Sequence, residues 1–154
     1  MPKTYAHKAD ARLTLTSRLA DLALVRPWVD ALAVEHALPQ DTVFAINLCL
    51  EEALSNIIRH GYGGESNHAI TIDFAPSGKN ALTFTIEDSA PPFRPVEPAE
   101  AQQAPAPTSL DELIPGGQGI RLMRRFAGSL AWETLPHGNR LTIGFSIAPP
   151  KTQS

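Results

Sequence analysis

Cysteine is nearly absent from this chain of 154 residues, which contains only Cys49 and therefore forms no intramolecular disulfide. A chain so poor in cysteine is typical of reducing compartments, and we expect a cytoplasmic protein. Long apolar runs are missing as well, because no stretch approaches the about 18 residues of a membrane-spanning helix, so no membrane contact is expected. Basic residues are not in excess. Lys and Arg number 13 against 16 Asp and Glu, and the formal net charge of −3 argues against a direct nucleic-acid partner.

Proline, by contrast, is abundant and unevenly placed. Of the 14 prolines, seven lie in one stretch that has no hydrophobic period: Pro91, Pro92, Pro95, Pro98, Pro105, Pro107 and Pro115. A loop of this length inside a compact domain is uncommon and is usually functional or disordered. The length of the chain favours a single domain over residues 1–154, with this loop inside it.

Alternating polar and apolar residues predict five strands. Turn residues at 76–80 and 136–139 join four of them into two hairpins. The alternating segments are 12–16, 70–74, 82–86, 130–134 and 141–147. Glu87 and Asp88 are expected to end the third strand.

Apolar residues at helical spacing predict about three helices, over residues 18–36, from 41 or 42 to His60, and 119–127. Pro27 either kinks the first helix or marks the first turn of a second one. Asp41 or Thr42 is a candidate N-cap of the next helix. Strands in hairpins together with a few helices predict an α+β fold, a two-layer sandwich whose mixed, mostly antiparallel sheet has the helices on one face.

Three polar residues follow one another at helical spacing in the second predicted helix. Glu52, Asn56 and His60 are spaced i, i+4, i+8, so their side chains lie along nearly one face. The Asn oxygen is a suitable ligand for Mg²⁺, and the Glu can accept or orient a proton. A solvated helix face is the alternative, but the apolar neighbours on both sides make this a narrow polar stripe on a buried helix.

Two further segments carry candidate binding residues. Asp88 follows an apolar strand, where its carboxylate can accept a hydrogen bond from an exocyclic amine such as that of adenine, although turn or cap residues are commoner at such positions. Gly116, Gly117 and Gly119 precede a helix, and glycines before a helix N-terminus let backbone N–H groups approach a phosphate. The spacing matches neither the dinucleotide fingerprint nor a P-loop.

Two other classes of site are not supported by the sequence. No G-x-S-x-G motif is present, which argues against a nucleophilic hydrolase. The remaining histidines show no spacing typical of zinc ligands: His7, His36, His68 and His137.

Taken in order, three segments resemble the motifs of one family. Residues 50–62 (LEEALSNIIRHGY) resemble the N box of the GHKL, or Bergerat-fold, ATPases, residues 86–93 (IEDSAPPF) resemble the G1 box, and residues 116–123 (GGQGIRLM) resemble the G2 box. An N box that ends in His-Gly-Tyr and a G1 box that continues Pro-Pro-Phe are similar to those of the anti-sigma-factor serine/threonine kinases. The resemblance covers residues 11–147 and implies the Bergerat ATP-binding fold, with ATP held between helices and sheet.

The resemblance implies a role for each matching residue. Glu52 would be the catalytic general base, Asn56 the Mg²⁺ ligand, and Asp88 the residue that takes the adenine amino group. Ala90 stands in the G1 box where the family has glycine. A Cβ there takes space where the family brings the backbone close to adenine, and it disfavours positive φ. A cost of about 1 kcal/mol on binding would weaken the ATP affinity about tenfold.

The remaining implied residues lie around the phosphates and the loop. Gly117, Gly119 and the backbone at Ile120 would line the phosphates and hinge a lid, and His60 would pack beneath the site. The proline-rich residues 89–115 match the ATP lid in position.

The function implied by the resemblance is an ATP- and Mg²⁺-dependent serine/threonine kinase that binds a sigma factor and phosphorylates a serine of an anti-sigma-factor antagonist. Dimerisation is implied in the same way. The alternative is a nucleotide-sensing or degenerate module that sequesters a partner without kinase activity. A sensor histidine kinase fits poorly, because the chain has no room for the helical hairpin that carries the phosphoacceptor histidine.

Overall fold

The computed structural model describes residues 10–93 and 119–147. None of the helices in these two ranges is long and apolar enough to cross a membrane. Along the chain the elements are β1 (Ala11–Thr16), the 3₁₀ helix η2 (Leu19–Leu24), α1 (Val25–His36), α2 (Gln40–Asn56), the π-helical turn η3 (Ile57–Gly61), β2 (Ala69–Pro76), β3 (Ala81–Asp88), α4 (Gly119–Phe126), β4 (Ser129–Leu135) and β5 (Gly138–Ser146).

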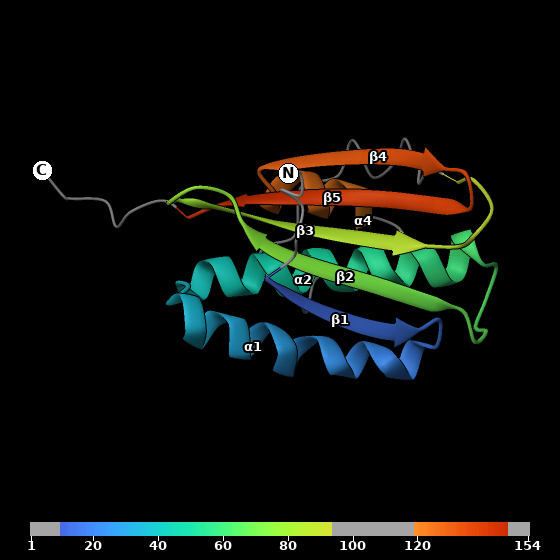
Figure 1. Cartoon of the computed structure of the whole chain (residues 1–154), viewed down its shortest axis with the longest axis horizontal. Helices are drawn as coiled ribbons and strands as arrows, with labels where there is room; N and C mark the ends of the chain where they lie inside the picture. The colour runs from blue at the N-terminus through green and yellow to red at the C-terminus, as the bar shows by residue number, and fades with distance from the viewer. Residues whose placement is uncertain (1–9, 94–118, 148–154) are drawn as a thin grey trace, which may run out of the picture.

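The five strands form one sheet in the order β1-β2-β3-β5-β4, and Figure 1 shows the helices as a second layer. The predicted α+β two-layer fold is confirmed. The expectation of a mixed sheet is wrong for the described residues, because every neighbouring pair is antiparallel. The reason is topological. A single crossover helix between neighbouring strands makes them parallel, but two helices in succession connect β1 to β2, so these strands run antiparallel. β3 and β4 are separated by β5, which is antiparallel to both.

The core lies between the inward face of the sheet and the helices. Alternate residues of β2, β3 and β5 are buried there, and the rings of Phe74, Phe84 and Phe145 follow one another with centroids 5.3 and 5.9 Å apart. The opposite face is polar and carries the ion pairs Arg12–Asp73 and Arg140–Glu87. The buried alternating residues are Ile70, Ile72, Phe74, Leu82, Phe84, Ile86, Leu141, Ile143 and Phe145.

The single cysteine lies within this core on α2. Cys49 has no exposed surface, and burial, with a smaller contribution from the neighbouring charge of Glu52, raises the pKa of its thiol to about 12. The thiol therefore packs as a small apolar group.

The helix starts correct one expectation and decide another. Pro27 lies in the first turn of α1, which is separate from η2, so it marks a new helix rather than a kink. The predicted N-cap at Asp41 or Thr42 is wrong: α2 begins at Gln40 after Pro39, without a side-chain cap. Asp41 lies in the first turn, where its negative charge favours the positive end of the helix dipole.

The end of the second helix also differs from the prediction. The α-helix ends at Asn56 and continues as the wider turn η3, in which the Tyr62 N–H donates to the carbonyl of Ile57 at 2.9 Å. A π-helical turn breaks the i, i+4 spacing, so His60 no longer follows the face of Glu52 and Asn56. His60 is exposed, whereas Asn56 is buried.

Candidate functional site

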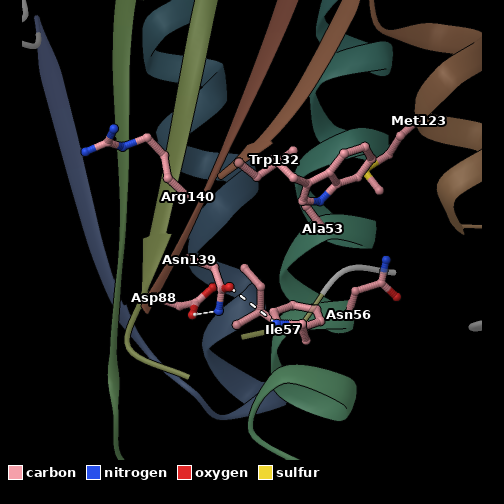
Figure 2. A pocket seen from close by; sticks show the side chains of 10 residues that line it. Ala53, Asn56, Ile57, Asp88, Met123, Trp132, Asn139 and Arg140 are labelled. Atoms are coloured by element: carbon pink, nitrogen blue, oxygen red, sulfur yellow. Dashed lines mark hydrogen bonds between the residues drawn. The ribbon is translucent and has the colours of Figure 1, made fainter. Parts of the chain in front are cut away.

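A polar pair interrupts the apolar inward face of the sheet. Asp88, the last residue of β3, lies directly opposite Asn139, the second residue of β5, and both continue the inward-facing series of their strands. Asp88 is 8% and Asn139 5% exposed. The Asn139 Nδ2 donates to Oδ1 of Asp88 at 2.9 Å (Figure 2). Because buried polar groups are costly, such a pair at the end of an apolar face indicates a specific purpose.

The Asp88 carboxylate has one oxygen engaged and one with capacity left. Oδ1 also accepts the backbone N–H of Ala90 at 2.9 Å. Burial raises the pKa of Asp88 above its ordinary value, and the hydrogen bonds from Asn139 and Ala90 offset part of that shift. The Asn139 side chain and the Ala90 backbone N–H both donate to Oδ1, and the Asn139 backbone also stabilises the carboxylate. Oδ2 keeps lone-pair capacity to accept a hydrogen from a ligand.

This pair lines one end of a pocket between the sheet and α2. The pocket is narrow and partly open to solvent, and the space within it that water-sized molecules can occupy is about 10 Å³. In Figure 2, Asp88 and Asn139 lie at the strand ends and Asn56 on the facing helix. A mainly apolar lining with a few convergent polar groups is typical of small-molecule sites. The lining residues are Ala53, Asn56, Ile57, Asp88, Phe93, Met123, Trp132, Asn139, Arg140 and Leu141.

On the helix side, α2 presents Asn56 and Glu52 one turn apart. Asn56 is 6% exposed and lines the pocket, and its amide makes no hydrogen bond within the described part of the chain. Glu52 is half-buried and lies outside the pocket lining. Burial raises its pKa, the charge of Arg59 opposes the shift, and the charge of Glu51 adds to it. Glu51 differs, because it pairs with Arg26 at 2.8 Å.

Asn56 and Glu52 suit a metal ion whose other ligands are water molecules and substrate phosphates. Across residues 10–93 and 119–147, no group of three or more His, Cys, Asp or Glu is placed to hold a metal alone. Asn56 offers one unengaged amide oxygen, and Glu52 a carboxylate one turn away. Mg²⁺ fits such a donor set, because it keeps several waters and is commonly bound by one or two protein oxygens together with substrate phosphates.

The conformation of Ala90 removes one expected obstacle. Ala90 is 2% exposed, and among the described non-glycine residues only Ala37 has a positive φ. The chain therefore leaves β3 in a conformation that alanine adopts without left-handed strain. The expectation that Ala90 adds such strain is wrong.

The other residues predicted for the site lie outside this pocket lining or outside the described residues. Gly119 begins α4, and Ile120 is buried in the hydrophobic core rather than in the pocket lining. The prediction that His60 packs beneath the site is wrong, because His60 is exposed. Gly117 and the lid segment from residue 94 onward lie outside the described residues.

Asn139 is the main site residue that sequence reasoning missed. It was assigned to a loop over 136–139, but the turn consists only of Pro136 and His137, and β5 begins at Gly138. The inward series Leu141, Ile143, Phe145, extended back by two residues, reaches Asn139. Trp132 of β4 also lines the pocket.

Gly138 allows β5 to approach the backbone of Asp88. Its φ is +156°, and a Cβ at this position would overlap the carbonyl oxygen of Asp88. We expect Gly138→Ala to lower the free energy of unfolding by about 1–3 kcal/mol, because the strands must separate to admit the methyl group. Gly78→Ala is the control, since Gly78 has a φ of +80° but open space around it. Equal losses for both variants in urea unfolding would show that the overlap has no effect beyond backbone strain.

Residues 15–145 match the family described as the histidine kinase-like ATPase domain. The chain belongs to this family. The GHKL resemblance found in the three motifs is thereby confirmed, and the pocket falls inside the matched range. An ATPase domain of this kind implies ATP as its nucleotide.

One curated relative and one solved structure show how far the likeness extends. The serine/threonine-protein kinase BtrW of Bordetella bronchiseptica is 30% identical to this ATPase domain over 137 residues, which cover 89% of this chain and 92% of BtrW. The structure of the RsbU and RsbW domains of Rv1364c from Mycobacterium tuberculosis superposes with a TM-score of 0.60 over 94% of this chain and 35% of that one. At 11% identity, this second likeness shows the fold alone.

Proposed function

We propose that this ATPase domain is a serine/threonine-protein kinase of the anti-sigma regulatory type. It transfers the γ-phosphoryl group of ATP to a serine of an anti-sigma-factor antagonist and sequesters a sigma factor. The observation that carries the proposal is the buried Asp88–Asn139 pair, which lines the same pocket as Asn56. The family and the name of the relative BtrW support the choice of kinase.

The strand end of the pocket suits the base of the nucleotide. Oδ2 of Asp88 accepts the exocyclic amine of adenine while Oδ1 remains bonded to Asn139 and Ala90. The apolar side chains of Ile57, Met123 and Leu141 line the pocket and exclude water from the ring. A keto oxygen at the same ring position would face the carboxylate, so the pocket selects adenine over guanine.

The helix end of the pocket suits the phosphates. Bound Mg²⁺ would neutralise charge on the transferred phosphoryl group, and the amide oxygen of Asn56 would be its protein ligand. In this proposal Gly117, Gly119 and the backbone at Ile120 line the phosphates. The start of α4 at Gly119 supports that role, since free N–H groups at a helix N-terminus favour anions.

Glu52 is the proposed general base. Its carboxylate accepts the proton of the partner's serine hydroxyl as the serine oxygen bonds to the γ-phosphorus. The bond between that phosphorus and the bridging oxygen breaks, and ADP leaves. Half-burial supports this role, because it raises the pKa of Glu52 towards the range in which a carboxylate takes a proton effectively.

The partners belong to the same proposal. The antagonist and the sigma factor are proposed because the chain is similar to BtrW and has the fold of the RsbU and RsbW domain structure. We also propose a homodimer, as the resemblance to the anti-sigma-factor kinases implies, and a cytoplasmic location. They are tested by the mass of the purified protein in solution and by fractionation of the cells that produce it.

Calorimetric titration with ATP and Mg²⁺ is the first test of the proposal. We expect saturable binding at submillimolar concentration and much weaker binding of GTP, because Asp88 presents an acceptor rather than a donor. A second candidate function is a nucleotide-free partner-binding module, favoured by the extra Cβ of the buried Ala90 at a position where the family has glycine. No heat of binding up to millimolar ATP would support that module and overturn the kinase proposal.

A further inference from the structure

The Asn139 side chain connects β5 to most of the segment that leaves β3. Its Nδ2 donates to Oδ1 of Asp88 at 2.9 Å, to the carbonyl of Pro91 at 3.1 Å and to the carbonyl of Ala90 at 3.3 Å. Its Oδ1 accepts the backbone N–H of Phe93 at 3.4 Å. One amide in a strand thus uses both its donor and its acceptor groups on residues 88–93.

The segment has few other means of holding its shape. It has left the sheet, and neither Pro91 nor Pro92 has a backbone N–H group. Tyr62 of the helix layer provides a second attachment, since its hydroxyl accepts the Ser89 N–H at 2.8 Å and lies 3.0 Å from the Ser89 Oγ. Tyr62 reaches only Ser89, whereas Asn139 reaches the residues on both sides of it.

We propose that Asn139 is a positioning residue for nucleotide binding, which holds residues 88–93 in the conformation that presents Oδ2 of Asp88 to the base. The inference rests on the proposed function, because it assigns Asn139 a part in the same pocket. Asn139 engages Oδ1 and leaves Oδ2 for the ligand. It also accepts the backbone N–H of Phe93, whose ring lies against Gly61, the last residue of η3. Residues 88–93 therefore already have the conformation that binds the base. The affinity for the nucleotide is not reduced by the entropy of ordering this segment on binding.

Asn139 also contributes to the pKa of Asp88. Burial raises the pKa of Asp88, and the donors on Asn139 and Ala90 lower it. Charged neighbours make no resolved contribution to the pKa of Asp88. On β3 and β5, Glu87 and Arg140 pair with each other at 2.7 Å. On the helix side, Arg59 and His60 of η3 are exposed, and Glu52 of α2 lies outside the pocket lining. Loss of the Asn139 amide donor therefore raises the pKa of Asp88. ATP binding needs the ionised carboxylate. When the pH is lowered, a variant without this donor therefore loses ATP affinity at a higher pH than the wild type does.

Two substitutions separate the contribution to Asp88 from the contribution to the rest of the segment. Asn139→Leu removes every side-chain hydrogen bond while keeping the branched shape and the number of side-chain heavy atoms, and Asn139→Thr retains one hydroxyl donor beside Asp88. ATP affinity is measured by calorimetry from acid to neutral pH. We expect Asn139→Leu to bind ATP at least about tenfold more weakly at neutral pH, with its acid loss of affinity moved to higher pH. Asn139→Thr is expected to bind more weakly than wild type while keeping a pH profile close to it.

The control variant is Asn80→Leu, because Asn80 is exposed in the turn between β2 and β3, far along the sheet from Asp88. Its ATP affinity and pH profile should equal those of the wild type. Absence of ATP binding by the wild type would overturn the proposed function. Wild-type binding together with unchanged affinity and pH profile in both Asn139 variants would overturn the role of Asn139 alone.

A measurement on the wild-type protein covers the case in which both Asn139 variants fail to fold. The side-chain amide protons of Asn139 are observable by NMR, and the hydrogen bonds described above should make them exchange slowly with solvent before ATP is added. ATP should then shift their resonances, because the base contacts the neighbouring oxygen. Fast exchange in the free protein, or resonances that ATP leaves unmoved, would contradict the proposal.

Discussion

Asp88→Asn is expected to weaken ATP binding about 100-fold. The site needs two acceptors at this residue, one for Asn139 and Ala90 and one for the adenine amine, and an asparagine amide provides only one. Whichever way the new amide turns, its NH₂ group meets another donor. The loss of a hydrogen bond to a charged group with a buried donor left unpaired costs about 3 kcal/mol, which corresponds to the stated factor.

Calorimetric titration of this variant with ATP and Mg²⁺ gives the dissociation constant directly. Asp73→Asn is the matched control, since Asp73 lies on the neighbouring strand β2, faces the opposite side of the sheet and pairs with Arg12. That surface pair contributes at most about 1 kcal/mol to stability and nothing to the pocket. If Asp88→Asn bound ATP as tightly as Asp73→Asn, the assignment of Asp88 to the base would be wrong.

Glu52→Gln is expected to lower the rate of phosphotransfer by about 100- to 10,000-fold and to leave the ATP dissociation constant within a few-fold of wild type. Glutamine keeps the size and the hydrogen-bonding oxygen of glutamate but cannot take the proton of the serine hydroxyl. The measurement uses radiolabelled ATP with an anti-sigma-factor antagonist as acceptor. Parallel ATP titrations separate binding from catalysis.

The pH dependence gives the same assignment a second test. Burial raises the pKa of Glu52 above that of an exposed glutamate. When the pH is lowered, the phosphotransfer rate of the wild type should therefore begin to fall at a higher pH than it would with an exposed glutamate as the base. That acid limb should be missing in Glu52→Gln. Glu51→Gln is the control, because Glu51 is the adjacent carboxylate and is engaged by Arg26. A wild-type rate in Glu52→Gln, or an equal loss in Glu51→Gln, would show that Glu52 is not the base.

Hydrophobic alternation predicted the sheet well, because each strand has one buried face. In the structure Asp88 continues the inward-facing series of Leu82, Phe84 and Ile86 by one step. The order of the strands and the absence of parallel neighbours could not be predicted locally. They depend on how many helices separate two strands and on the insertion of β5 between β3 and β4.

The site was predicted only in part, and each failure has a local cause. The stripe of Glu52, Asn56 and His60 assumed a continuous α-helix, and apolar spacing does not distinguish that helix from one that widens into a π-turn at Ile57. Asn139 was assigned to a turn because glycine and asparagine are typical turn residues. Its inward position depends on a turn of only two residues, Pro136 and His137.

The burial of Cys49 has a practical consequence for labelling chemistry. A thiol with no exposed surface and a pKa of about 12 holds almost no reactive thiolate at neutral pH, so maleimide and iodoacetamide reagents should pass it by in the folded protein. Dyes or spin labels can therefore be attached at an introduced surface cysteine without first removing the native one.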